Sequence, residues 1–147
     1  MCGDPTTKLS LLVDSVRIKR HLIAEIERHA WECSPLECCG LLGGRGDLIE
    51  QIYRLTNIAA TPETRYFADP KGIFQAMKLI RAQGEKLLGI YHSHPQSVAY
   101  PSPTDIEQAY YPEAVYFIIS LAPRSELRAY CLEQGEVEEI GYEIVDR

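Results

Sequence analysis

The sequence predicts one α/β domain in which helices flank a mixed sheet, and three observations favour this fold class. The length of 147 residues suits a single domain with a substantial core. Hydrophobic residues make up 46% of the chain and charged residues 24%, as in ordinary globular proteins. Short apolar runs that suit buried strands alternate with segments whose apolar residues recur every three or four positions, which is typical of helices packed on a sheet. We expect residues 1–8 to be a loose N-terminus and residues 9–147 to form the domain.

Three segments have the features of helices. Residues 19–33 place apolar side chains on one face at spacings of three and four, namely Leu22, Ile23, Ile26 and Ala30. The second helix begins at Asp69-Pro70, where an N-cap residue precedes a proline at the first helical position, and it ends at Gly84. The third is expected over residues 104–110, because the following Tyr111-Pro112 disfavours its continuation.

The remaining apolar or alternating segments are expected to be strands of the sheet. They lie near residues 16–18, at 38–43, 47–57, 64–68, 87–91, 115–121 and 127–132, with a final strand or two within 137–145. The glycine-rich sequence over residues 43–47 predicts a hairpin turn. The strand over 87–91 is short and apolar, which is typical of a buried position in the sheet.

Three residues of metal-ligating type follow that buried strand closely: His92, His94 and Asp105. Side chains alternate along a strand, so His92 and His94 point to the same side if the strand extends that far. Pro95 cannot donate a hydrogen bond to the sheet, so the strand is expected to end there. Two imidazoles can therefore meet one cation without a turn between them.

Two histidines and one carboxylate make a three-ligand zinc site, with one ion per chain. Three protein ligands leave the fourth tetrahedral position open, which is the arrangement of catalytic rather than structural zinc. Iron held by two histidines and a carboxylate is the rival interpretation, and the ligand types alone do not decide between the two metals. An ordinary structural role for the His92 and His94 pair also remains open at this point.

The segment around Asp105 has a second interpretation as a helix start. In Ser102-Pro103-Thr104-Asp105 the serine suits the N-cap, the proline the first helical position and the aspartate the third. The two interpretations are compatible, because such a cap would also fix Asp105 in place. Glu37, which precedes the strand at 38–43, is by itself most simply an exposed carboxylate at the mouth of that strand.

Composition argues against several classes of protein. The net charge of −6 argues against a nucleic-acid-binding surface. No apolar run approaches the ~20 residues that a membrane helix needs. The first residues, Met-Cys-Gly-Asp-Pro, are neither basic nor apolar, so no secretory signal is visible. The cysteine count of five is odd and includes no Cys-x-x-Cys motif, from which we expect reduced thiols and a cytoplasmic protein.

Two separated motifs carry a resemblance to a known family. The sequence Glu37-x-Cys39-Gly40-Leu41-Leu42, followed much later by His92-x-His94-x7-Ser102-x2-Asp105, resembles the JAMM/MPN+ metallopeptidase family. The similarity covers roughly residues 9–145, and the combined pattern is far more specific than either half. The resemblance implies the α/β fold of that family, with His92, His94 and Asp105 as zinc ligands. It also implies that Glu37 is the general base and that the Ser102 hydroxyl lies beside the reacting centre.

The compact length resembles the prokaryotic branch of this family. The resemblance implies hydrolysis of a peptide or isopeptide bond after the C-terminal glycine of a partner protein. That partner is expected to be a small β-grasp ubiquitin-like or sulfur-carrier protein ending in Gly-Gly, from which cysteine or another amine is released. No nucleic acid and no membrane are expected as partners.

Three alternative functions belong to different classes. A non-catalytic MPN scaffold would hold a complex together without zinc, but this chain has every residue of the metal motif. A zinc nucleobase deaminase would need His-x-Glu and a later Pro-Cys-x-x-Cys, and neither is present. The relatives of the family that are associated with DNA repair share His-x-His-Pro, but the acidic composition and the Glu37 motif disfavour them.

Overall fold

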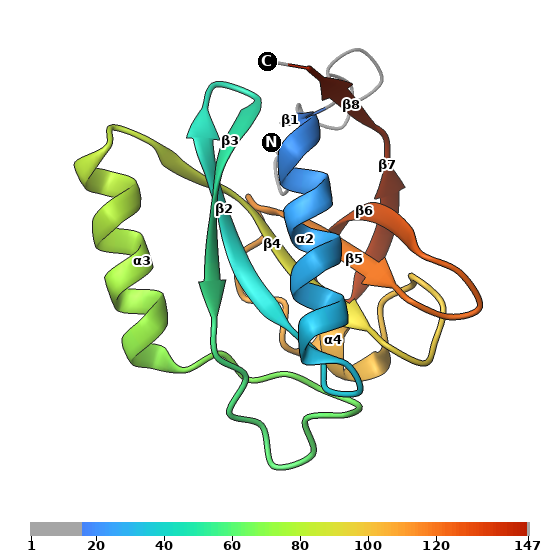
Figure 1. Ribbon diagram of the computed structural model, residues 1–147. Helices are drawn as coiled ribbons and strands as arrows, with labels where there is room; N and C mark the ends of the chain where they lie inside the picture. The colour runs from blue at the N-terminus through green and yellow to red at the C-terminus, as the bar shows by residue number, and fades with distance from the viewer. Residues whose placement is uncertain (1–15, 147) are drawn as a thin grey trace.

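The computed structural model describes residues 16–146, which form a mixed sheet with helices on both faces (Figure 1). The expected loose N-terminus, residues 1–8, lies outside the described residues. The strands are β1 (Val16–Lys19), β2 (Cys39–Arg45), β3 (Leu48–Leu55), β4 (Lys86–His94), β5 (Val115–Ser120), β6 (Glu126–Glu133), β7 (Glu136–Ile140) and β8 (Tyr142–Val145). Over the described range they form one eight-stranded sheet in the order β7-β6-β5-β4-β2-β3-β1-β8. The predicted α/β fold class is therefore confirmed.

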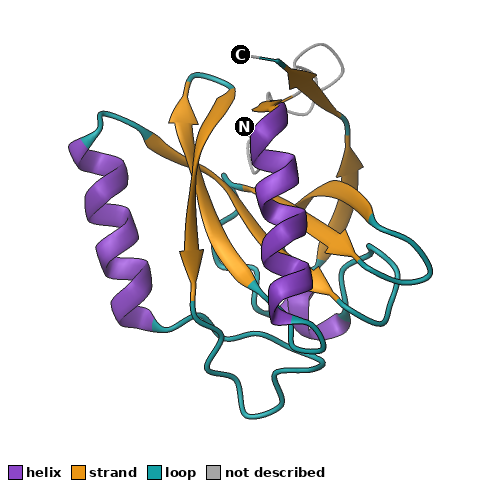
Figure 2. Ribbon diagram, viewed as in Figure 1, coloured by secondary structure: helices purple, strands orange, loops and turns teal. Residues whose placement is uncertain are grey.

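Helices α2 (Arg20–Cys33) and α3 (Pro70–Ala82) cover opposite faces of the sheet (Figure 2). The apolar stripe predicted for the first helix is buried: Leu22, Ile26 and Ala30 pack into the core on the α2 side. A second core lies on the α3 side and includes Ile80 and Ile118. Asp69 caps α3 as predicted, because its carboxylate accepts a hydrogen bond from the Lys71 amide (3.1 Å).

Strand β4 lies in the middle of the sheet and positions the site. It pairs antiparallel with β2 and parallel with β5, so both of its edges are hydrogen-bonded. The register places His92 opposite Cys39 on one side and Ile118 on the other. Because the strand runs to His94, both histidines point to the α3 side, while Tyr91 packs into the core on the α2 side.

Three expected features differ from the structure. The predicted strand over residues 64–68 does not form; only an isolated bridge joins Asn57 and Ala68. The Asn57 side chain hydrogen-bonds to the backbone at several points there, so the segment is held as a loop. The predicted helix over 104–110 is only the short α4 (Pro103–Glu107), since the Ala109 amide donates to the Ile106 carbonyl three residues back (3.4 Å) and does not continue the four-residue spacing. The predicted hairpin turn over 43–47 narrows to residues 46–47.

The cysteines divide between the two cores. Cys38 lies in the core on the α2 side and Cys39 in the core on the α3 side, as expected for consecutive strand residues. Cys33, Cys38 and Cys39 are free thiols, whereas Cys131 is disulfide-bonded, so the expectation of reduced cysteines is wrong for Cys131. Within residues 16–146, every helix is too short or too polar to cross a bilayer.

Candidate metal centre

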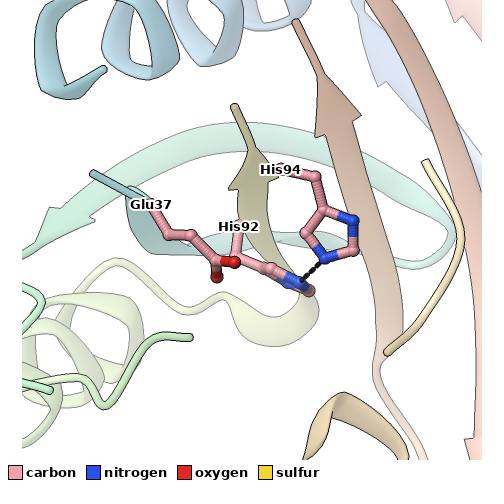
Figure 3. Close-up of side chains that lie close together, drawn as sticks. All are labelled: Glu37, His92 and His94. Atoms are coloured by element: carbon pink, nitrogen blue, oxygen red, sulfur yellow. Dashed lines mark hydrogen bonds between the residues drawn. The ribbon is translucent and has the colours of Figure 1, made fainter. Parts of the chain in front are cut away.

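Three ligand-type atoms converge at the C-terminal end of β4. The Nε2 atoms of His92 and His94 lie 3.1 Å apart (Figure 3). The Oδ2 atom of Asp105 lies 3.1 Å from each of them, so the three atoms form an equilateral triangle. All three side chains are withdrawn from solvent, with side-chain exposures of 1% for His92, 5% for His94 and 6% for Asp105.

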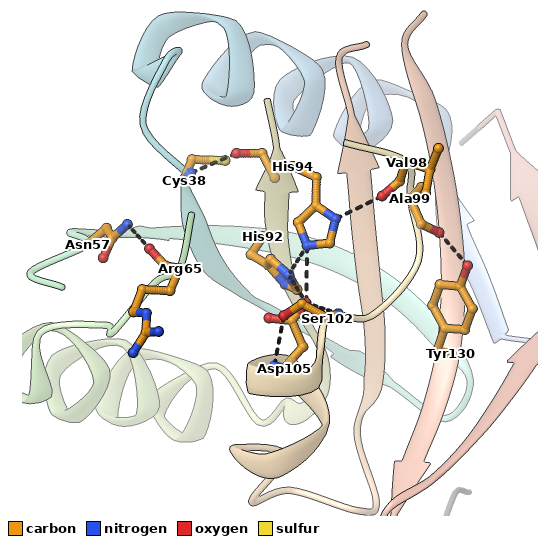
Figure 4. Close-up of polar contacts among 11 residues, drawn as sticks. Cys38, Asn57, Arg65, His92, His94, Val98, Ala99, Ser102, Asp105 and Tyr130 are labelled. Carbon is orange, nitrogen blue, oxygen red and sulfur yellow. Dashed lines mark hydrogen bonds and ion pairs between the residues drawn. The ribbon is translucent and has the colours of Figure 1, made fainter. Parts of the chain in front are cut away.

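The start of α4 fixes the position of Asp105. Its amide donates to the Ser102 hydroxyl oxygen (3.1 Å), and the Ser102 amide donates to Asp105 Oδ2 (2.8 Å), which makes a reciprocal capping box (Figure 4). The oxygen that faces the two imidazoles is therefore also the one that accepts the cap bond. The capping and metal-site interpretations of this segment describe the same geometry.

The dimensions of the triangle fit a metal ion. Bonds of about 2.0–2.1 Å at the tetrahedral angle place two zinc ligands about 3.3 Å apart, close to the 3.1 Å observed here. Nδ1 of His94 donates to the Val98 carbonyl (2.8 Å), so a neutral His94 directs the lone pair of Nε2 at the Asp105 carboxylate. Only a proton or a cation can stabilise a lone pair facing a carboxylate at this distance.

Burial and neighbouring groups shift the pKa values of all three side chains of the triangle. Burial lowers the pKa of His92 despite the attraction of Asp105. Burial opposes protonation of His94 too, but its hydrogen bonds to Asp105 and to the Val98 carbonyl outweigh this and raise its pKa. Burial alone would raise the pKa of Asp105, yet the two imidazoles and the Ser102 amide hold it well below its usual range. The group therefore presents an ionised carboxylate beside imidazole nitrogens, the donor set that zinc prefers.

Glu37 stands beside the triangle as a buried carboxylate, not as the exposed one that its position before a strand suggested. It is only 4% exposed, and one of its carboxylate oxygens lies within 4.8 Å of ring nitrogens of both His92 and His94. Oε1 has no hydrogen-bond partner among the described residues. Burial raises the pKa of this carboxyl to about 8, with Asp105 adding to the shift and His94 opposing it. An unpartnered buried carboxylate of this kind can hold or release a proton near neutral pH.

The structure brings the five sequence-predicted residues into one site, and it adds two that the sequence pattern did not indicate. The Tyr66 ring stacks on the His92 ring, with centroids 4.5 Å apart and planes at 28°. Asn57 hydrogen-bonds to the backbone of Glu37 (3.0 Å). Both belong to the loop over residues 56–69, where contacts depend on tertiary folding and no periodicity identifies them.

An apolar cavity of about 160 Å³ adjoins the site on the α3 side. Tyr66 lies between this cavity and the triangle of His92, His94 and Asp105, since its ring both lines the cavity and stacks on His92. The opposite walls come from β2 and α3, through residues such as Leu41, Ile73 and Met77. The rim carries the exposed aromatic side chains of Phe67 and Tyr110.

Comparisons with known proteins agree on one family. The family model described as prokaryotic homologs of the JAB domain matches residues 19–132. A probable TtuB-protein conjugate cleaving protease from Thermus thermophilus is 36% identical over 119 residues, which are 81% of this chain and 77% of that protein. The CysO-cysteine peptidase of Mycobacterium tuberculosis is 33% identical over 134 residues, 88% of this chain and 91% of that protein. A solution structure of a protein from Desulfitobacterium hafniense superposes with a TM-score of 0.81 at 33% identity, covering 90% of this chain and 94% of that one.

Proposed function

Because the chain belongs to the family of prokaryotic homologs of the JAB domain, we propose that it is a zinc-dependent peptidase acting on ubiquitin-like or sulfur-carrier proteins. It hydrolyses the peptide or isopeptide bond that follows the carrier's C-terminal glycine. The observation that carries the proposal is the 3.1 Å triangle of His92, His94 and Asp105 with the buried, unpartnered carboxylate of Glu37 beside it. A scaffold protein has no need for such a carboxylate, whereas a hydrolase does.

His92, His94 and Asp105 would hold one zinc ion, and the resemblance of the motif to the JAMM/MPN+ pattern supports this ligand set. When bound, zinc supplies Lewis-acid activation of water and of a carbonyl oxygen. The protein's own part is to keep the triangle rigid. The capping box holds Asp105, and the Val98 carbonyl holds the His94 ring and its tautomer.

Glu37 moves the proton. Its carboxylate takes a proton from the attacking water and passes it to the amine that leaves the carrier. Burial raises the pKa of the Glu37 carboxyl to about 8, and a divalent charge in the neighbouring triangle would lower it. The carboxyl would then exchange a proton readily at the working pH.

Ser102 contributes a hydroxyl group to the same centre. Its oxygen accepts the bond from the Asp105 amide, and accepting this bond does not use the hydroxyl hydrogen. That hydrogen can therefore be donated to the oxyanion that develops on the scissile carbonyl. The position of Ser102 at the N-cap of α4 is enough to place its hydroxyl beside Asp105.

The substrate class follows from the relatives. One is named for cleaving TtuB–protein conjugates and another for its action on CysO-cysteine. A carrier ending in Gly-Gly suits the enclosed metal centre, because glycine lets the scissile backbone approach closely. The apolar cavity beside Tyr66 can receive side chains of the carrier. We place the activity in the cytoplasm, although the cysteines are mixed: Cys33, Cys38 and Cys39 are free thiols, whereas Cys131 is disulfide-bonded.

The test compares the zinc-loaded wild type with Glu37→Gln on a Gly-Gly-ended carrier that bears a C-terminal amino acid. Release of the amino acid is followed by the mass of the carrier. Glutamine cannot accept the proton, so cleavage should fall by about 10²–10⁴-fold, while zinc content and carrier affinity stay close to those of the wild type. The matched control is Glu85→Gln, because Glu85 is also a buried carboxyl (7% exposed) but lies before the other end of β4.

Glu85→Gln should cleave at the wild-type rate. If Glu37→Gln also cleaves at that rate, the proposed mechanism is wrong. If the folded, zinc-loaded wild type cleaves none of a panel of such carriers, the chain is better described as a non-catalytic scaffold.

A further inference from the structure

We infer that Asn57 is a positioning residue: its single amide group holds the backbone of Glu37 and the ring of Tyr66 in the places that the metal centre needs. The inference rests on the proposed function for the role of Glu37. The positions that Asn57 fixes are argued from hydrogen bonds alone. Asn57 follows the end of β3 and lies at the neck of the loop over residues 56–69. A compact loop with close ends is a common support for functional residues.

The backbone of Glu37 is clamped on both sides by this loop. Its amide donates to the Pro62 carbonyl (2.8 Å), and its carbonyl accepts from Asn57 Nδ2 (3.0 Å). Neither contact is part of a strand ladder, because β2 begins only at Cys39. The loop therefore helps to set the direction in which the Glu37 side chain leaves the backbone, and Asn57 supplies one of its two bonds to Glu37.

The same side-chain amide hydrogen-bonds to the backbone on both sides of Tyr66. Asn57 Nδ2 donates to the Arg65 carbonyl (3.1 Å), a contact visible in Figure 4, and Oδ1 accepts from the Phe67 amide (3.0 Å). These two residues flank Tyr66 in the chain. With both neighbours fixed, the Tyr66 ring is held flat against the His92 ring at 4.5 Å. One side chain thus connects the proposed base with the outer face of a proposed metal ligand.

The amide of Asn57 is fully used, which makes the effect of substitution specific. Oδ1 also accepts from the Ala59 amide (3.0 Å), so it serves two donors, while Nδ2 donates to the Glu37 and Arg65 carbonyls and makes a longer contact with the Pro62 carbonyl (3.5 Å). Aspartate has the same shape and keeps both acceptor contacts, but it cannot donate to the Glu37 and Arg65 carbonyls. Asn57→Asp therefore removes the half of the clamp that holds the Glu37 carbonyl, while the backbone bond from the Glu37 amide to the Pro62 carbonyl can still form.

The fold does not depend on Asn57 alone. The neck of the loop is also closed by backbone bonds, from the Ile58 amide to the Phe67 carbonyl (2.8 Å) and from the Asp69 amide to the Thr56 carbonyl (2.9 Å). The sheet and α3 are anchored independently of the side chain. Substitution at Asn57 should consequently loosen the site more than the domain.

The experiment compares the wild type with Asn57→Asp and Asn57→Ala. Thr64→Ala is the matched control, because the Thr64 hydroxyl bonds only within the same loop, to the Thr61 carbonyl (3.5 Å). We expect kcat on the carrier adduct to fall by about 10–100-fold in both Asn57 variants, with KM and zinc stoichiometry close to the wild-type values. Thr64→Ala should match the wild type in all three quantities.

Hydrogen exchange measured by NMR gives a readout that needs no substrate. In both Asn57 variants the Glu37 amide should exchange faster than in the wild type, while amides of β4 and β5 keep their protection. The Phe67 amide should remain protected in Asn57→Asp, which keeps the acceptor, and lose protection in Asn57→Ala.

Unchanged protection of the Glu37 amide in Asn57→Asp would overturn the inference, whether or not a substrate is known. A loss of kcat that is matched by an equal loss of bound zinc would also overturn it. So would faster hydrogen exchange of amides throughout the sheet, since Asn57 would then contribute only to stability. If the wild type cleaves no carrier, the proposed function fails and the exchange experiment still decides the role of Asn57.

Discussion

The contact between His29 and Tyr91 predicts a pH-dependent stability that can be calculated. Nδ1 of His29 on α2 lies 2.7 Å from the hydroxyl of Tyr91, which precedes the proposed ligand His92 on β4. The His29 side chain is buried, and burial, helped by the charge of Arg54, lowers its pKa to about 4. In the unfolded chain the pKa should be about 6.5. Well above pH 6.5 the imidazole is neutral in both states and does not change the free energy of unfolding.

As the pH falls below 6.5, His29 binds a proton in the unfolded state but not in the folded state, so the free energy of unfolding decreases. The loss proceeds at up to about 1.4 kcal/mol per pH unit and levels off below pH 4, where the total is about 3 kcal/mol. Between pH 7.5 and pH 5.0 the contribution of His29 is about 2 kcal/mol. That is a large fraction of the stability of an ordinary domain.

The assay is urea unfolding at pH 7.5 and 5.0 of the wild type and His29→Gln, both stripped of metal. Glutamine does not titrate, and its amide can still bond to Tyr91. Between the two pH values, the free energy of unfolding should fall by about 2 kcal/mol more in the wild type than in the variant. The double difference cancels the titration of every group that is not coupled to His29. Equal losses in the two proteins would refute the reasoning.

Two further predictions concern the metal centre itself. Elemental analysis should find about one zinc per chain in the wild type and none in His92→Ala/His94→Ala, and retention of full stoichiometry in that variant would remove these residues from the ligand set. Ser102→Ala should lose both the cap, at a cost of about 1 kcal/mol in unfolding free energy, and activity, whereas Ser102→Thr should retain most of each. Activity of Ser102→Ala equal to that of the wild type would exclude the hydroxyl from the chemistry.

The sequence alone determined the fold class and most of the elements. Periodicity located α2 because one face of the helix is buried, and short apolar runs located the strands around the site because both faces of these central strands are buried. Cap chemistry located the starts of α3 and α4 because it depends on residues only a few positions apart. The His-x-His spacing likewise required both rings to lie on one side of β4, and this is how the structure has them.

Tertiary structure decided what depends on contacts between distant segments. The expected strand at 64–68 is a loop because the side chain of Asn57 hydrogen-bonds to its backbone groups. No local sequence pattern predicts these bonds. Glu37 looked exposed in the sequence because nothing in its neighbours predicts that the loop over 56–69 folds beside it. Its burial, its raised pKa and the stacking of Tyr66 on His92 all arise from this long-range packing. Local sequence specifies which residues can do the chemistry, whereas desolvation and position, which give them that ability, are properties of the folded chain.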